Sequence, residues 1–163
     1  MAPILRRLAA RVLLVDEQER ILLLRSVGPR AGTVFWFTPG GGIDPGEDAR
    51  SAAIREVWEE TGLRDLALTA EIWHRRHTFT WGSQTYDQSE RWFLARVANF
   101  EPVPQALTPL EQREIDGHRW WGLAEMDASS DSFAPAALAH LTRELLRHGP
   151  PAQPLDIDSR AGA

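Results

Sequence analysis

Three glutamates in a short stretch of the chain, Glu56, Glu59 and Glu60, have the spacing of ligands for a metal ion. Separations of three and four residues place them within roughly 100° on one side of an α-helix. Carboxylates one turn apart repel one another and raise one another's pKa, so we expect a cation between them. An all-oxygen set suits Mg²⁺ or Mn²⁺, and residues 41–63 contain no histidine or cysteine that would suggest zinc.

The residues on either side of these glutamates predict a helix. The turn-forming residues 39–46, Pro-Gly-Gly-Gly-Ile-Asp-Pro-Gly, precede an alanine-rich run without proline. We expect the helix to begin near Glu47 or Asp48 and to end at Gly62, because glycine adopts the left-handed backbone of a helix terminus most easily.

The two sides of this helix are expected to differ. On the glutamate side, three small residues are predicted to leave room for a bulky anionic ligand: Ala49, Ala52 and Ala53. On the opposing side, three apolar residues are predicted to pack against the core: Ile54, Val57 and Trp58.

The stretch from Gly41 to Leu63 resembles the Nudix box, the signature of the Nudix hydrolase family. Every fixed position of the box is filled, by Gly41, Glu47, Arg55, Glu56, Val57, Glu59, Glu60, Gly62 and Leu63. A simpler interpretation, in which the glutamates are only the solvated face of an amphipathic helix, does not account for so many matches. The resemblance implies an α+β fold, the α/β/α sandwich of this family with a central mixed β-sheet.

The resemblance also implies a metal site. Glu56, Glu59 and Glu60 would ligate divalent cations, and one of them or a nearby acid would help to activate water as the catalytic base. A backbone carbonyl of Gly40 or Gly41 would add a further metal ligand. The expected cofactor is Mg²⁺ or Mn²⁺.

Two further features follow from the resemblance. Glu47 and Arg55 would pair with each other and hold the loop and helix together as structural support of the site. In the later part of Nudix domains, a loop glutamate can complete the metal shell or act as general base. Glu114 is our first candidate for this catalytic role, and Glu111 is the second.

The chemistry expected from the resemblance is hydrolysis of a phosphoanhydride. The family cleaves nucleoside diphosphates linked to another moiety, so the product would be a nucleoside monophosphate. Glutamates alone would repel a polyanionic substrate, and a cation would bridge the two. A MutT-like (deoxy)nucleoside triphosphate hydrolase and a hydrolase of another nucleoside diphosphate derivative both remain open. The alternative is a sensor that binds a nucleotide without hydrolysing it.

Arginines are the candidates for substrate phosphate, because all 18 basic residues are arginine. Five of them lie where they could reach a substrate: Arg25, Arg30, Arg75, Arg76 and Arg91. Side chains alternate along a strand, so one of the neighbours Arg75 and Arg76 is expected to point into a cleft and the other away from it. The alternative for each is a solvent-facing residue.

The whole chain of 163 residues, with a net charge of -5 and no cysteine, suits a single domain. We expect this Nudix domain over residues 1–149, followed by a proline-rich tail over residues 150–163 that docks on the domain or on a neighbouring chain. The negative charge argues against a nucleic-acid polymer and for a small nucleotide substrate. No apolar stretch approaches the roughly 20 residues that cross a bilayer, so we expect a cytoplasmic protein that does not enter the membrane, either monomeric or homodimeric.

The remaining pattern predicts strands over residues 9–15, 21–25, 66–80, 86–97 and 119–121 and a second helix over residues 133–148. Residues 99–109 contain three prolines and are predicted to be irregular. Trp36 has two interpretations, stacking on a base or packing in the core, and core packing is favoured.

Overall fold

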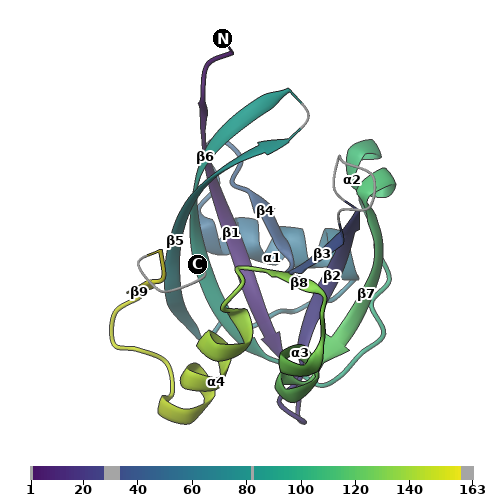
Figure 1. Ribbon diagram of the computed structural model, residues 1–163, viewed down its shortest axis with the longest axis vertical. Coiled ribbons are helices and arrows are strands. Elements are labelled where there is room, and N and C mark those ends of the chain that lie inside the picture. The colour runs from purple at the N-terminus through teal and green to yellow at the C-terminus, as the bar shows by residue number, and fades with distance from the viewer. Residues whose placement is uncertain (1, 28–33, 82, 159–163) are drawn as a thin grey trace.

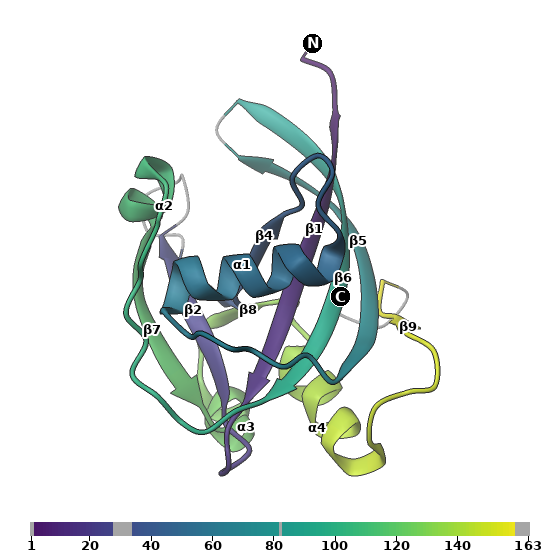
Figure 2. The ribbon, with the colours of Figure 1, turned by 180° about the vertical axis from the view of Figure 1, so that it is seen from behind.

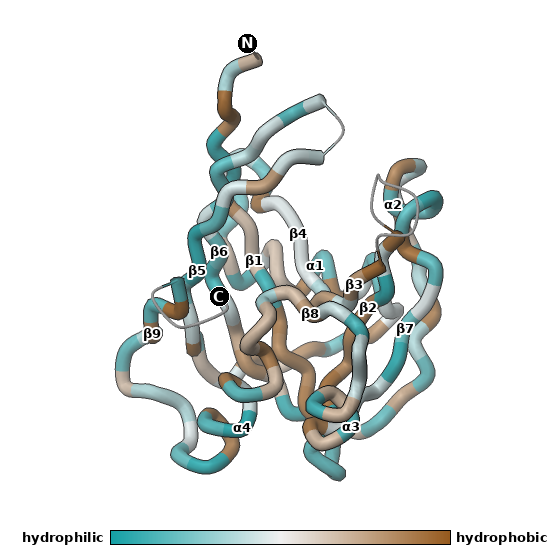
Figure 3. Tube along the Cα trace, in the orientation of Figure 1, coloured by the Kyte–Doolittle hydropathy of each residue, from teal (hydrophilic) through white to brown (hydrophobic). Residues whose placement is uncertain are grey.

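Strand β1 (Leu5–Val15) runs through the middle of a curled β-sheet in this computed structural model, which describes residues 2–27, 34–81 and 83–158 (Figure 1). The last four residues of β1, Val12 to Val15, are fully buried, so both faces of the strand are covered. In Figure 3, hydrophobic residues gather along β1 and its neighbour β2, whereas the β5–β6 hairpin is largely hydrophilic.

The remaining strands are β2 (Ile21–Val27), β3 (Val34–Phe37), β4 (Gly40–Gly42), β5 (Ala70–Trp81), β6 (Gln84–Arg96), β7 (Ile115–Trp121), β8 (Ser132–Ala134) and β9 (Leu155–Asp156). They form one sheet in the order β8-β3-β2-β1-β6-β5-β9, in which β4 also pairs with β1 and β7 with β2. The β1–β6, β3–β8 and β5–β9 pairs are parallel and the others are antiparallel. The predicted mixed sheet is confirmed.

Helices cover both faces of this sheet (Figures 1 and 2). Helix α1 (Ala49–Thr61) crosses one face, and α3 (Leu123–Ala128) and α4 (Leu138–His148) lie against the other. Side chains of β1 alternate between two cores, with Val12 and Leu14 toward α1 and Leu13 toward α4. The predicted α/β/α arrangement is therefore confirmed. Within the described ranges, no helix is long and apolar enough to cross a membrane.

Helix α1 begins and ends where the sequence predicts. The Asp48 side chain accepts a hydrogen bond from the Ser51 N–H at 2.7 Å, and Gly62 closes the helix with φ at 78°.

The predicted division of α1 into a ligand side and a packing side is only partly right: Val57 packs in the core as expected, but the alanines and Ile54 do not behave as predicted. Ala52 and Ala53 are fully buried in the core beneath the helix, and Ile54 on the supposed packing side is 41% exposed. The alanines and the buried glutamates share the side that faces the sheet, where small side chains let α1 approach β1 closely.

The C-terminal helix is shorter than predicted. The helix expected over residues 133–148 begins only at Leu138, because residues 132–134 form β8 and pair with β3. Trp36 on β3, a strand that the sequence did not predict, lies in the core with its ring edge-on to Trp121 at 5.2 Å between centroids.

Part of the tail packs on the body of its own chain. Strand β9 pairs with β5, the Ile157 N–H donates to the His74 carbonyl at 3.0 Å, and the Ile157 side chain is fully buried.

Candidate active site

Arg55 on α1 binds the loop that precedes the helix. Its Nε and Nη2 donate to the two carboxylate oxygens of Glu47 at 2.8 and 2.9 Å, and Nη2 also donates to the Gly42 carbonyl at 3.1 Å. These hydrogen bonds lower the pKa of Glu47 to about 2 and raise the pKa of Arg55. The loop and the helix are thus joined by a bidentate ion pair.

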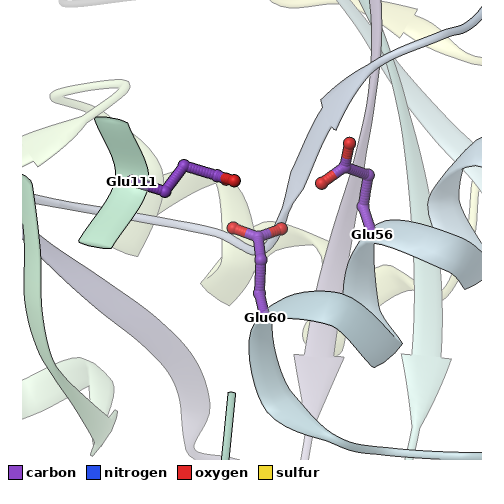
Figure 4. A group of neighbouring side chains, drawn as sticks. All are labelled: Glu56, Glu60 and Glu111. Atoms are coloured by element: carbon purple, nitrogen blue, oxygen red, sulfur yellow. The ribbon is translucent and has the colours of Figure 1, made fainter. Parts of the chain in front are cut away.

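Two glutamates of α1 and one of α2 (Pro109–Glu114) converge on one point (Figure 4). One carboxylate oxygen from each of Glu56, Glu60 and Glu111 lies within 4.8 Å of the others. Glu56 and Glu60 are only 8% and 2% exposed. Burial, followed by the charge of Glu56, raises the pKa of Glu60 well above its ordinary value, and burial also raises the pKa of Glu56.

The two carboxylate oxygens of Glu60 differ in their hydrogen bonding. Its Oε1 accepts a hydrogen bond from the Gly40 N–H at 2.9 Å, whereas its buried Oε2 has no hydrogen-bond partner among the described residues. A buried, unpartnered carboxylate oxygen beside two other carboxylates is unfavourable unless a cation binds there. One oxygen from each of Glu56, Glu60 and Glu111 makes a set that fits a hard divalent cation.

Gly40 and Gly41 let the loop approach the glutamates. A Cβ on Gly41 would lie 2.6 Å from the carboxyl carbon of Glu56, which is closer than side-chain carbons approach other atoms. Gly40 has φ at 148°, and a Cβ there would lie 2.2 Å from the Ala10 carbonyl oxygen.

Glu59 lies outside this cluster. Its carboxylate accepts from the Arg55 Nη1 at 3.2 Å, and the same nitrogen donates to Glu56 at 3.0 Å. The helical period explains the difference, because Glu56 and Glu60 are about 40° apart around the axis and Glu59 is about 100° from Glu60.

The structure brings Glu111, and not Glu114, beside the helix glutamates. The side chain of Thr108 caps α2 by accepting from the Glu111 N–H at 3.2 Å, and Glu111 accepts from the Thr108 N–H at 2.9 Å. Glu114 is not a member of this cluster, and burial raises its pKa. The sequence Thr108-Pro-Leu-Glu111 is a capping-box signal for this helix, which the sequence analysis did not use.

The candidate substrate arginines are scattered. Arg75 is partly buried beside Glu90, with Nη1 at 3.5 Å from that carboxylate, and its buried Nε has no hydrogen-bond partner in the described part of the chain. Arg76 points the other way, is exposed, and pairs with Asp87 at 2.7 Å.

The other two candidates within the described ranges, Arg25 and Arg91, do not meet at the cluster. Arg91 pairs with Glu71 at 2.7 Å and is half-exposed, and Arg25 pairs with Asp116. Arg30 lies outside the described residues.

Arg11 was not among the sequence candidates. Its Nη1 donates to the carbonyls of Thr38 and Gly40 at 3.2 and 3.1 Å, and its charge opposes the rise of the Glu60 pKa. The sequence did contain a signal for Arg11, because it is a charged residue within the apolar run of β1.

Comparison with known proteins agrees with this geometry. The model of the NUDIX domain family matches residues 5–145. An RNA pyrophosphohydrolase of Novosphingobium aromaticivorans is 34% identical over 119 residues, which cover 67% of this chain and 73% of that protein. A putative 8-oxo-dGTP diphosphatase of Bacillus subtilis is 44% identical over 61 residues, covering 37% of this chain and 38% of the relative.

Among solved structures, the MutT protein from Methanosarcina mazei Go1 matches 90% of this chain and 97% of its own with a TM-score of 0.63 and 20% identity, a likeness of fold. The resemblance seen in the Gly41–Leu63 box is confirmed over most of the chain. This protein belongs to the Nudix hydrolase family and is an enzyme of the Nudix pyrophosphohydrolase type.

Proposed function

We propose that this chain hydrolyses a phosphoanhydride bond of a nucleotide in a Mg²⁺-dependent reaction that releases a nucleoside monophosphate. The substrate is a (deoxy)nucleoside triphosphate or a nucleoside diphosphate linked to another group. The observation that carries the proposal is the convergence of Glu56, Glu60 and Glu111, together with a buried oxygen of Glu60 that has no hydrogen-bond partner among the described residues.

The proposed cation ligands are Glu56, Glu60 and Glu111, with Glu59 and a carbonyl of Gly40 or Gly41 as further ligands. A bound Mg²⁺ supplies positive charge for the phosphates and lowers the pKa of a coordinated water.

Other residues of the site hold the loop in place or accept the proton. Glu47 and Arg55 hold the loop against α1, which keeps the Gly40 N–H on Glu60. Glu60, Glu59 and Glu111 are the carboxylates that we propose as acceptors of the proton from the attacking water.

For substrate phosphate we favour Arg75 among the arginines in the described ranges. Its Nη1 lies 3.5 Å from Glu90, but its Nε–H is buried and without a partner, whereas Arg25, Arg76 and Arg91 each hydrogen-bond a carboxylate. A guanidinium with a free N–H can add a hydrogen bond to a phosphate oxygen without first breaking an ion pair.

The test uses chromatography to measure the release of nucleoside monophosphate in the presence of Mg²⁺. The panel contains the nucleoside triphosphates, 8-oxo-dGTP, ADP-ribose, nucleotide sugars, dinucleoside polyphosphates, and an RNA with a 5′-triphosphate, since one relative is named for RNA and one for 8-oxo-dGTP. Glu59→Gln and Glu60→Gln serve as blanks, and Asp16→Asn is the control for loss of a buried carboxylate, since Asp16 lies in the β1–β2 turn. Turnover that survives in the folded blanks contradicts the proposal.

A nucleotide sensor is the alternative, and it predicts measurable nucleotide binding with no product from any member of the panel. We propose further that the enzyme acts in the cytoplasm as a monomer or homodimer, and that residues 1–149 form the catalytic domain.

A further inference from the structure

A buried carboxylate lies outside the box, on strand β6. Glu90 is 3% exposed and accepts hydrogen bonds from Gln88 Nε2 at 2.7 Å, Trp92 Nε1 at 3.1 Å and Arg11 Nε at 3.3 Å, and His77 Nε2 lies 3.3 Å away. Burial by itself raises the pKa of this carboxyl, but the hydrogen bond with His77 and the charge of Arg11 outweigh it, so the net pKa lies well below its usual range. Glu90 is therefore a buried anion held by several donors.

Arg11 connects this anion to the loop of the candidate active site. Arg11 lies opposite Gly40 in the β1–β4 pair, and its guanidinium reaches Glu90 on one side and the carbonyls of Thr38 and Gly40 on the other. The Gly40 N–H in turn donates to Glu60. One continuous set of hydrogen bonds thus runs from β6 through β1 and β4 to α1.

The charge of Arg11 makes its orientation important. Its guanidinium contacts the carbonyl of Gly40, the residue whose N–H binds Glu60, and its charge opposes the rise of the Glu60 pKa. A guanidinium that turned from the carbonyls to the carboxylates would form an ion pair with Glu60 and compete with a cation. The ion pair with Glu90 holds the guanidinium on the carbonyls.

We propose that Glu90 is a positioning residue that acts through Arg11: it keeps the guanidinium on the Thr38 and Gly40 carbonyls, so that Gly40 orients Glu60 and the carboxylate cluster stays free to bind a divalent cation. This inference rests on the proposed function, because it concerns the same site.

The test measures Mn²⁺ binding to the protein alone, from the electron paramagnetic resonance signal of free Mn²⁺, together with kcat and KM. Three variants are compared: Arg11→Lys, Glu90→Gln and the double variant. Lysine keeps the positive charge but cannot bridge two carbonyls and a carboxylate, so Arg11→Lys tests geometry without changing the net charge. Asp16→Asn is the matched control, a buried carboxylate that binds Arg20 at 2.9 Å in the β1–β2 turn.

Each single variant is expected to weaken Mn²⁺ binding about tenfold or more and to lower kcat by a similar factor. Substitution of residues that orient metal ligands has effects of this size. The double variant is expected to bind Mn²⁺ no more weakly than whichever single variant binds it less tightly, because both substitutions interrupt the same set of hydrogen bonds. The control should bind Mn²⁺ like the wild type. If Glu90→Gln does not fold, Arg11→Lys carries the test by itself.

Two results would overturn the proposal. One is Mn²⁺ affinity of Arg11→Lys within about twofold of wild type, the scatter expected of an uninvolved residue. The other is a double variant whose loss equals the product of the two single losses, since Glu90 would then act by charge alone or through Arg75. If the wild type binds Mn²⁺ but hydrolyses nothing, the proposed function fails, and the Mn²⁺ series still decides the role of Glu90.

Discussion

Glu60 accepts a hydrogen bond from the backbone N–H of Gly40 through one carboxylate oxygen and leaves its other, equally buried oxygen without a partner among the described residues. The first contact fixes the side chain, and the carboxylate lies within 4.8 Å of those of Glu56 and Glu111. Glu60 is thus held rigidly in a position that is unfavourable for the isolated protein and suited to a cation.

The substitution Glu60→Gln is expected to separate stability from activity. Glutamine can still accept from the Gly40 N–H, and it removes a buried charge, so the metal-free variant should melt at a higher temperature than the wild type. Its turnover should fall about 100-fold or more, because a cation ligand is lost. Thermal melts in EDTA and product release measure the two effects, and a variant that is both less stable and fully active would contradict this reading of the cluster.

The stabilisation by Mg²⁺ is expected to grow with pH. Glu56 and Glu60 have raised pKa values in the folded protein, so the unfolded chain releases these protons first. Between the unfolded and folded pKa values the folded state binds more protons, and the metal-free protein therefore loses stability as the pH rises. Mg²⁺ competes with those protons, so its effect on the melting temperature should be small near about pH 5 and larger near about pH 8.

Melts with Mg²⁺ and with EDTA at the two pH values measure this dependence. Glu60→Gln should flatten it, and an Mg²⁺ effect that is the same at both pH values would argue against binding at these carboxylates.

Glu111 is expected to matter more than Glu114. Glutamine at position 111 preserves the capping box of α2 and removes only the charge, so Glu111→Gln should weaken Mn²⁺ binding and turnover by about 10- to 100-fold without unfolding the helix. Glu114→Gln is the matched control and should stay within about threefold of wild type. Titration of Mn²⁺ against both variants decides between the two acids, and the opposite order would restore Glu114 as the first candidate.

Arg55→Lys is expected to destabilise the protein. Lysine cannot form the bidentate contact with Glu47 and reach the Gly42 carbonyl as well, so the free energy of unfolding in urea should fall by about 1 to 2 kcal/mol. Arg143→Lys makes the same change in an exposed pair with Asp127 and should cost less than about 0.5 kcal/mol. Equal losses in the two variants would mean that the Glu47–Arg55 contact contributes no more than a surface ion pair.

Ile157 is expected to make the tail part of the stable fold. Because its side chain is fully buried against β5, Ile157→Ala should lower the free energy of unfolding by about 2 to 4 kcal/mol. The neighbouring Leu155 is 40% exposed, and Leu155→Ala should cost below about 1 kcal/mol. Urea unfolding of both variants tests whether residues beyond 149 are dispensable.

Local signals in the sequence predicted the parts of the site that lie within one segment. The cap at Asp48, the left-handed Gly62 and the helical spacing of the glutamates all follow from neighbouring residues. The capping box of α2 is equally local, and it identifies the helix that presents Glu111.

Contacts across the sheet were not predictable in this way. Arg11 and Glu90 are 79 residues apart, and only the parallel pairing of β1 with β6 brings them together. The same limit applies to β8, where an apolar pattern that suits a helix is overruled by pairing with β3.

The most direct test of the account is a crystal of the protein soaked in Mn²⁺ and examined for anomalous scattering. The account predicts a peak bounded by carboxylate oxygens of Glu56, Glu60 and Glu111, at about 2.0 to 2.6 Å from the Oε2 of Glu60. A crystal of active protein with no peak at this cluster, or with its Mn²⁺ bound elsewhere, would contradict it.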